Sequence, residues 1–189
     1  MKRSSKKSWL DRLSVLTLQQ RMLLNMVVMM ASVFLCLLLL PARLPGMELL
    51  HVTPDWLLIW VVTWSLKRNP TEGCFAGILL GLLQDAMTAP FPTHALGLGL
   101  VGFLSSYLQK QRLIAEDFAS ISLVVFGMAI FTETLLALQF GILTDRPFSE
   151  ILVDYQRIAL GSAILSSLWA PAIYFPLTRW WTLISLSRD

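Results

Sequence analysis

The chain has 189 residues and a formal net charge of +3, and its composition differs from that of a water-soluble domain. Hydrophobic residues make up 56% and charged residues 14%, against about 45–50% and about 25% in soluble domains. This composition excludes a disordered chain. The two cysteines, Cys36 and Cys74, lie in apolar stretches, which excludes a small disulfide-linked secreted domain. The basic residues separate apolar segments and do not gather with aromatic residues, so no nucleic-acid partner is expected.

The first apolar segment, residues 22–40, has only Asn25 and Ser32 as polar residues. A helix of this length measures about 28 Å, which matches the hydrocarbon core of a bilayer. The segment is too long for the apolar region of a signal peptide and lacks a small-residue cleavage site after it. We therefore expect a retained spanning helix.

Five further apolar segments follow, and several of them contain acidic residues that need protein neighbours. The sequence thus predicts an all-α membrane protein, a compact bundle of six transmembrane helices that occupies residues 22–184. A basic amphipathic cytoplasmic arm, 1–21, precedes the bundle, and a short cytoplasmic tail, 185–189, follows it. The six predicted spans are residues 22–40, 49–66, 72–88, 94–108, 119–143 and 158–177.

The basic residues predict the orientation of the chain. Lysine and arginine concentrate in short cytoplasmic loops, and six spans with both termini in the cytoplasm place twelve of the 15 basic residues on that side. The arm ahead of the first span either lies on the inner leaflet as an amphipathic helix or serves only as a topology signal. Its residues expected to contact the inner leaflet are Lys2, Arg3, Lys6, Lys7 and Arg12.

Small residues form a ladder along the third predicted span. Gly73, Gly77 and Gly81 recur at four-residue spacing, and Asp85 follows at the same interval. Residues four apart share one face of a helix, so the missing side chains form a groove for another helix backbone. That helix belongs either to this chain or to a partner protein.

Polar residues gather in the outer half of the predicted bundle. Asp85 and Glu133 lie at a similar depth, and Asp55 and His94 begin their spans from outside. The four residues are a candidate outer polar pocket for a ligand or ion, a polar interface for a partner helix, or a purely structural cluster. Asp55 follows Thr53 and Pro54, so we expect it to cap its helix.

The sequence contains no motif of a hydrolase, nucleotide-binding loop or metalloprotease, so neither an enzyme nor a catalytic residue is expected. The two histidines have no local spacing typical of a metal site. We therefore expect no metal and no cofactor.

The order of these motifs resembles the MreD family of rod shape-determining bacterial inner-membrane proteins. The resemblance is closest over residues 54–107, where Pro54 and Trp56 begin one span and the glycine ladder ends in Asp85 on the next. It implies an architectural or interface role, in helix packing or partner contact, for a set of family-like positions. These are Pro54, Trp56, Gly77, Gly81 and Asp85, and Gly73 joins them in the predicted helix-packing or partner contact as the first residue of the ladder.

The resemblance implies a non-enzymatic scaffold of the cell-elongation machinery in the bacterial inner membrane. Its implied partners are MreC, MreB filaments, the peptidoglycan glycosyltransferase and transpeptidase, and membrane lipids. The family is also thought to be similar to the substrate-binding subunits of energy-coupling vitamin transporters, which are six-helix proteins with an outward pocket. A substrate-binding subunit of a small-molecule transporter is therefore the alternative function.

Overall fold

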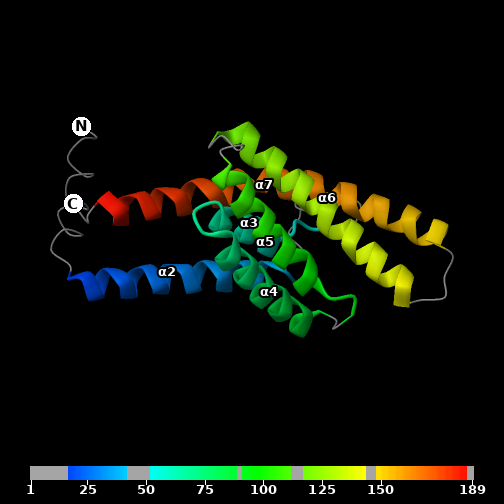
Figure 1. The fold of residues 1–189 in the computed structure, drawn as a ribbon, viewed down its shortest axis with the longest axis horizontal. Coiled ribbons are helices and arrows are strands. Elements are labelled where there is room, and N and C mark those ends of the chain that lie inside the picture. Colours follow the sequence, from blue (N-terminus) through cyan, green and yellow to red (C-terminus); the bar gives the residue numbers. More distant parts are fainter. Residues whose placement is uncertain (1–16, 42–51, 89–90, 112–116, 144–147, 187–189) are drawn as a thin grey trace.

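The computed structural model describes residues 17–41, 52–88, 91–111, 117–143 and 148–186, and within these ranges the chain forms six α-helices. Their bounds are α2 Leu18–Leu39, α3 Trp56–Ser65, α4 Pro70–Met87, α5 His94–Lys110, α6 Phe118–Leu143 and α7 Phe148–Leu186. Residues 1–16 of the predicted basic arm, which include all of its expected inner-leaflet contacts, lie outside these ranges, and α2 begins at Leu18, within the stretch 1–21 predicted as the arm. Figure 1 shows α4 paired with α5 and α6 paired with α7, with α3 behind them in the centre.

The short helix α3 is the centre of the fold. Nine of its ten residues are buried, because its sequence is apolar on every side and helices surround it. At about 15 Å it is too short to cross a bilayer alone. The sequence predicted a span over residues 49–66, whereas the helix begins only at Trp56, after the cap formed by Asp55; residues 42–51 are outside the described chain.

Helix α2 lies along one side of the bundle and is attached chiefly to α3. The Trp60 indole N–H donates a hydrogen bond of 2.8 Å to Ser32 Oγ, which joins the two helices. Most of the remaining α2 surface is apolar and open, with Met26 65% and Met30 66% exposed. Such a surface is stable against lipid or against another apolar helix, and not against water.

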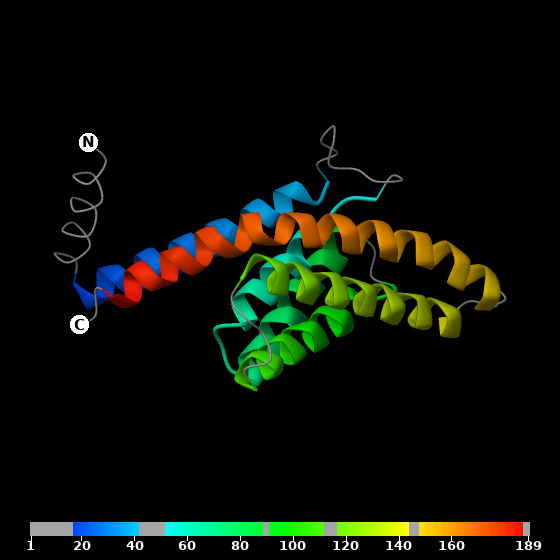
Figure 2. The same cartoon turned by 90° about the horizontal axis from the view of Figure 1, so that it is seen from above.

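Helix α7 has 39 residues and continues through Pro171 and Pro176. It arches over the bundle (Figure 2), which agrees with the loss of backbone hydrogen bonds that proline causes inside a helix. The beginning of α2 and the end of α7 lie at the same end of the molecule in both views (Figures 1 and 2).

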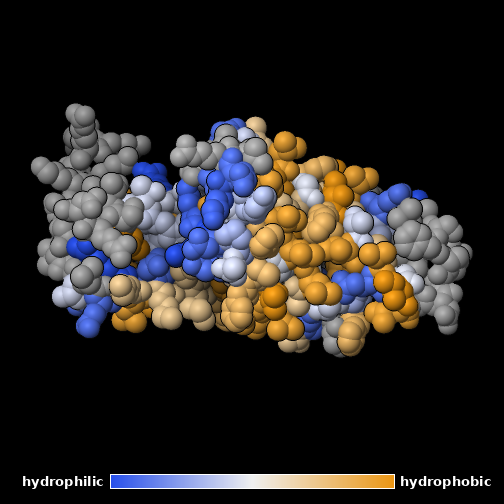
Figure 3. Space-filling view, viewed as in Figure 1, coloured by the Kyte–Doolittle hydropathy of each residue, from blue (hydrophilic) through white to orange (hydrophobic). Residues whose placement is uncertain are grey.

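The surface pattern is that of a membrane protein. Three of the described helices are long and apolar enough to cross a bilayer, over Gln19–Leu39, Phe118–Leu143 and Tyr155–Ile184. Figure 3 shows a broad apolar field over the middle and right of the molecule, with hydrophilic residues gathered to its left. The structure therefore has the elements of a helical membrane bundle, and the count of six spans remains a prediction.

Candidate functional site

The glycine ladder of α4 is filled by α5 of the same chain. Gly73 lies against the backbone of Gly102, and Gly81 lies against Ala95. At the middle rung, a Cβ atom on Gly77 would stand 2.5 Å from the Leu98 carbonyl carbon. Ordinary van der Waals contact begins at 3.4 Å, so only glycine allows the two backbones this approach.

The contact is reciprocal, because glycines of α5 also face α4. A Cβ on Gly102 would stand 2.6 Å from the Gly73 carbonyl carbon, and one on Gly99 would stand 2.7 Å from Ile78 Cγ1. Of the two alternatives for the groove, the structure shows intramolecular packing. A partner helix would have to use another face of α4.

Asp85 ends the ladder and holds the beginning of α5. Its Oδ1 accepts a hydrogen bond of 2.8 Å from the backbone N–H of His94 and lies 2.7 Å from His94 Nδ1. Its Oδ2 accepts a hydrogen bond from the Thr93 hydroxyl. A carboxylate at a helix N-terminus also complements the helix dipole, so Asp85 fixes the register of α5 against α4.

The same corner is tied to α6 through Gln139. The Thr93 N–H donates to Gln139 Oε1 at 3.1 Å, and Gln139 Nε2 donates to the Thr93 carbonyl at 3.2 Å. Thr93 itself caps α5, since its Oγ1 accepts from the Ala95 N–H at 3.2 Å. The polar groups in this corner thus join α4, α5 and α6 by backbone and side-chain hydrogen bonds.

A polar cavity of about 330 Å³ lies beside this corner. Three of the four residues of the candidate outer pocket line it, namely Asp55, His94 and Glu133. Asp85 is not among its lining residues, because its carboxylate is engaged with the beginning of α5. Sequence analysis did not single out Gln84, which also lines the cavity and whose Oε1 is buried without a hydrogen-bond partner among the described residues.

Asp55 caps α3, as its position after Thr53 and Pro54 predicts. Its Oδ1 accepts from the Leu58 N–H at 3.0 Å, and its own N–H donates to Ser166 Oγ at 2.9 Å. This second bond ties the cap to α7. Asp55 therefore has a structural role even though its side chain borders the cavity.

Pro54 and Trp56 lie on either side of this cap. Pro54 also lines the cavity. The Trp56 side chain is buried and meets Trp169 of α7 edge to face, with ring centroids 5.7 Å apart. These residues therefore set the direction in which α3 enters the core, which is an architectural role.

The polar side chains of this site hold helices in place, and several of them border one polar cavity. Within the described part of the chain, no group of three or more His, Cys, Asp or Glu residues is arranged to hold a metal ion. The fold and this site define a helical membrane protein whose polar residues mainly join helices.

Residues 20–180 match the family model for rod shape-determining protein MreD, and the chain belongs to that family. The resemblance inferred from the sequence is confirmed. No curated protein and no solved structure matches the chain. The family assignment, together with three helices of spanning length, places this chain among membrane proteins that function in rod shape determination.

Proposed function

We propose that the chain is a non-enzymatic scaffold of the cell-elongation machinery in the bacterial inner membrane, and that it binds MreC directly. The family match over residues 20–180 carries this proposal. MreB filaments and the peptidoglycan glycosyltransferase and transpeptidase are reached through the complex. By helping to organise these enzymes, the chain supports lateral wall synthesis.

The surface supports a role based on contacts between helices. The glycine seam is filled from within, so MreC is expected to pack elsewhere on the bundle. Exposed apolar side chains on α2 and α4 provide surface for this contact, since Phe34 is 61% exposed and Phe75 is 68% exposed. Lipid covers whatever part of these faces MreC leaves open.

The polar cavity favours a second candidate function, a substrate-binding subunit of a small-molecule transporter. A volume of about 330 Å³ is at the lower end of small-molecule pockets. His94 and Glu133 could hold a polar ligand there. In this alternative the chain retains its ligand independently of MreC.

One purification separates the two functions. The tagged chain is expressed at its native level in its own host and purified in mild detergent, and mass spectrometry then identifies bound proteins and small molecules. For a scaffold, we expect MreC to be recovered with the chain, and Glu133→Ala to leave that recovery unchanged. Glu72→Ala is the matched control, since Glu72 is exposed on α4 and is not among the residues that line the cavity.

Two results would contradict the scaffold proposal. One is the absence of MreC from every preparation while the chain remains folded. The other is a small molecule that is retained by the unaltered chain and by Glu72→Ala but is lost with Glu133→Ala, without any MreC. The second result would establish the transporter alternative.

A further inference from the structure

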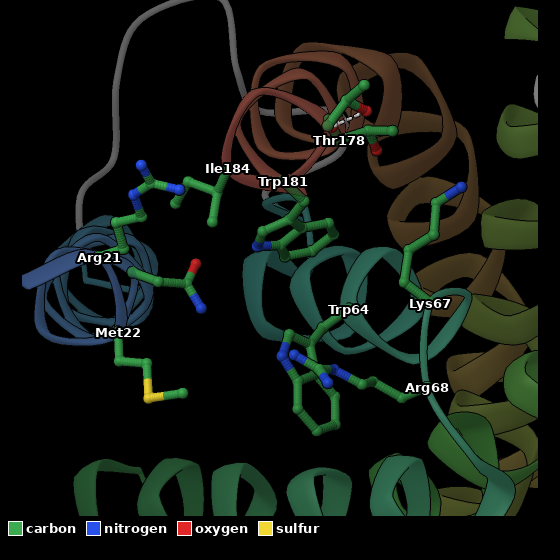
Figure 4. A pocket seen from close by; sticks show the side chains of 10 residues that line it. Arg21, Met22, Trp64, Lys67, Arg68, Thr178, Trp181 and Ile184 are labelled. Atoms are coloured by element: carbon green, nitrogen blue, oxygen red, sulfur yellow. Dashed lines mark hydrogen bonds between the residues drawn. The ribbon is translucent and has the colours of Figure 1, made fainter. Parts of the chain in front are cut away.

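A second cavity, of about 480 Å³, lies where the beginning of α2, the end of α3 and the end of α7 come together. Figure 4 shows Arg21 and Met22 on α2 facing Trp64 of α3 and Trp181 of α7. Neither the family nor the scaffold function assigns a role to this cavity. Its residues come from three distant parts of the sequence.

The wall of the cavity is cationic. Arg21, Lys67 and Arg68 line it, and none of its described lining residues is acidic. The Arg68 guanidinium carbon lies 5.3 Å from the centre of the Trp64 ring, a cation–π contact that orders the positive charge beside the indole. The wall therefore favours an anion.

Four residues that line this cavity each carry a buried polar atom without a hydrogen-bond partner among the described residues. These atoms are Asn25 Oδ1, Trp64 Nε1, Thr178 Oγ1 and Trp181 Nε1. A buried polar group without a partner is costly, so such groups are normally satisfied by a bound molecule or by water. An indole N–H can only donate, so both tryptophans require an occupant with acceptor oxygens.

The cavity lies at the ends of two helical segments that are long enough to span a membrane. Residues 21–25 form the first turns of the spanning segment Gln19–Leu39, and residues 178–184 form the last turns of Tyr155–Ile184. Tryptophan is typical of the membrane–water boundary, because its ring is apolar and its N–H is polar. Further along α2 from the cavity, Met26 and Met30 expose an apolar surface along which acyl chains can lie.

We propose that this cavity binds the phosphate-bearing headgroup of an anionic phospholipid, with the acyl chains against α2. Phosphate oxygens accept hydrogen bonds from the two indoles and pair with the cations. Basic pockets between spanning helices recognise lipid headgroups in this way. The proposal does not depend on MreC binding or on the scaffold function.

The test uses the full chain, purified and freed of lipid in detergent, and native mass spectrometry to count bound molecules. The probes are phosphatidylglycerol, phosphatidylcholine with the same acyl chains, and glycerol 3-phosphate as a soluble phosphate. We expect phosphatidylglycerol to bind at least about tenfold more tightly than the other two. The choline cation of phosphatidylcholine is repelled by the cationic wall, and glycerol 3-phosphate has no acyl chains to bury against α2.

Two variants and a matched control locate the binding. Lys67→Gln and Trp181→Phe should each weaken phosphatidylglycerol binding about tenfold, because the first removes a charge and the second removes an N–H donor together with part of the aromatic ring. Lys110→Gln removes a charge from another exposed lysine and should change binding less than twofold, because Lys110 does not line the cavity and would not contact the headgroup. The thermal unfolding midpoint shows that each variant is folded, and either cavity variant alone is sufficient for the test.

Three outcomes would overturn the proposal. Equal binding of phosphatidylcholine would mean that lipid covers the helices without a headgroup site. Equal binding of glycerol 3-phosphate would mean a site for soluble phosphates. Selective binding that neither Lys67→Gln nor Trp181→Phe weakens would place the lipid elsewhere on the protein.

Discussion

A methyl group at Gly77 tests the packing of α4 against α5 most directly. In Gly77→Ala, the new Cβ would stand 2.5 Å from the Leu98 carbonyl carbon and 2.9 Å from Gly99 Cα. Restoring ordinary contact requires the helices to separate by roughly 1 Å, which weakens dispersion along the whole seam. Overpacking of this kind costs about 1–3 kcal/mol. The separation would also lengthen the bonds between Asp85 and the beginning of α5.

The matched control is Gly127→Ala in α6. A Cβ on Gly127 would meet no atom within 4 Å, so this variant gains helix propensity without a clash. Both variants gain the same propensity, about 1 kcal/mol, and their difference therefore isolates the cost of overpacking. For a chain of this size we expect the unfolding midpoint of Gly77→Ala to lie several degrees below that of Gly127→Ala, at about 2–4 °C per kcal/mol.

The measurement is thermal unfolding in mild detergent, followed by circular dichroism at a helix wavelength. Cell-shape complementation by the same two variants gives the functional effect. Equal midpoints for Gly77→Ala and Gly127→Ala would refute the close approach of α4 and α5. They would also reopen the groove to a partner helix.

Three further predictions concern the hydrogen bonds and the topology. Ser32→Ala leaves the buried Trp60 N–H without its acceptor and should lower the free energy of unfolding by about 1–3 kcal/mol. The control is Ser167→Ala, which loses only a hydrogen bond within its own helix and should change the free energy of unfolding by less than about 0.5 kcal/mol. Asp85→Ala should cost about 0.5–1.5 kcal/mol for each of the half-buried donors of Thr93 and His94 that loses its acceptor. Glu72→Ala, on the exposed side of α4, should cost much less, and similar losses would contradict the role of Asp85. Single cysteines at Gln19 and Ser185, in a chain without Cys36 and Cys74, should both react with an impermeant maleimide from the cytoplasmic side only, and labelling from opposite sides would disprove the predicted orientation.

The sequence shows which face of α4 packs closely but not what packs there. Glycines at four-residue spacing identify the face, because their positions follow from helix geometry alone. The helix that fills it is determined by the fold, and Gly99 and Gly102 of α5 are recognised as its counterpart only once the two helices are seen together. The same limit applies to Asp85, for which the sequence left a ligand pocket, a partner interface and a structural role open, and whose carboxylate binds the beginning of α5.

The cationic cavity was not predicted for a related reason. Lys67 and Arg68 belong to a short loop, and Trp181 follows an arginine near the end of an apolar segment, so each is an ordinary interface residue by itself. The signal lies in their combination, since residues near the beginning of α2, the end of α3 and the end of α7 line one cavity. Only the structure shows that Trp64 and Trp181, whose indole nitrogens are buried without a hydrogen-bond partner among the described residues, line one cavity.

The short helix α3 bears on how often the chain crosses the membrane. Three helices reach spanning length, and three crossings alone would put the beginning of α2 and the end of α7 on opposite sides. Both lie at the same end of the molecule (Figures 1 and 2), so the predicted orientation, with both termini cytoplasmic, requires the segment from α3 to α5 to add an odd number of crossings. Helix α3 can contribute to a crossing because neighbouring helices bury it, so its length does not have to equal the thickness of the lipid layer. A hydropathy scan detects apolar segments that are long enough to cross a bilayer alone, whereas burial within the bundle allows the ten-residue α3 to lie within the membrane.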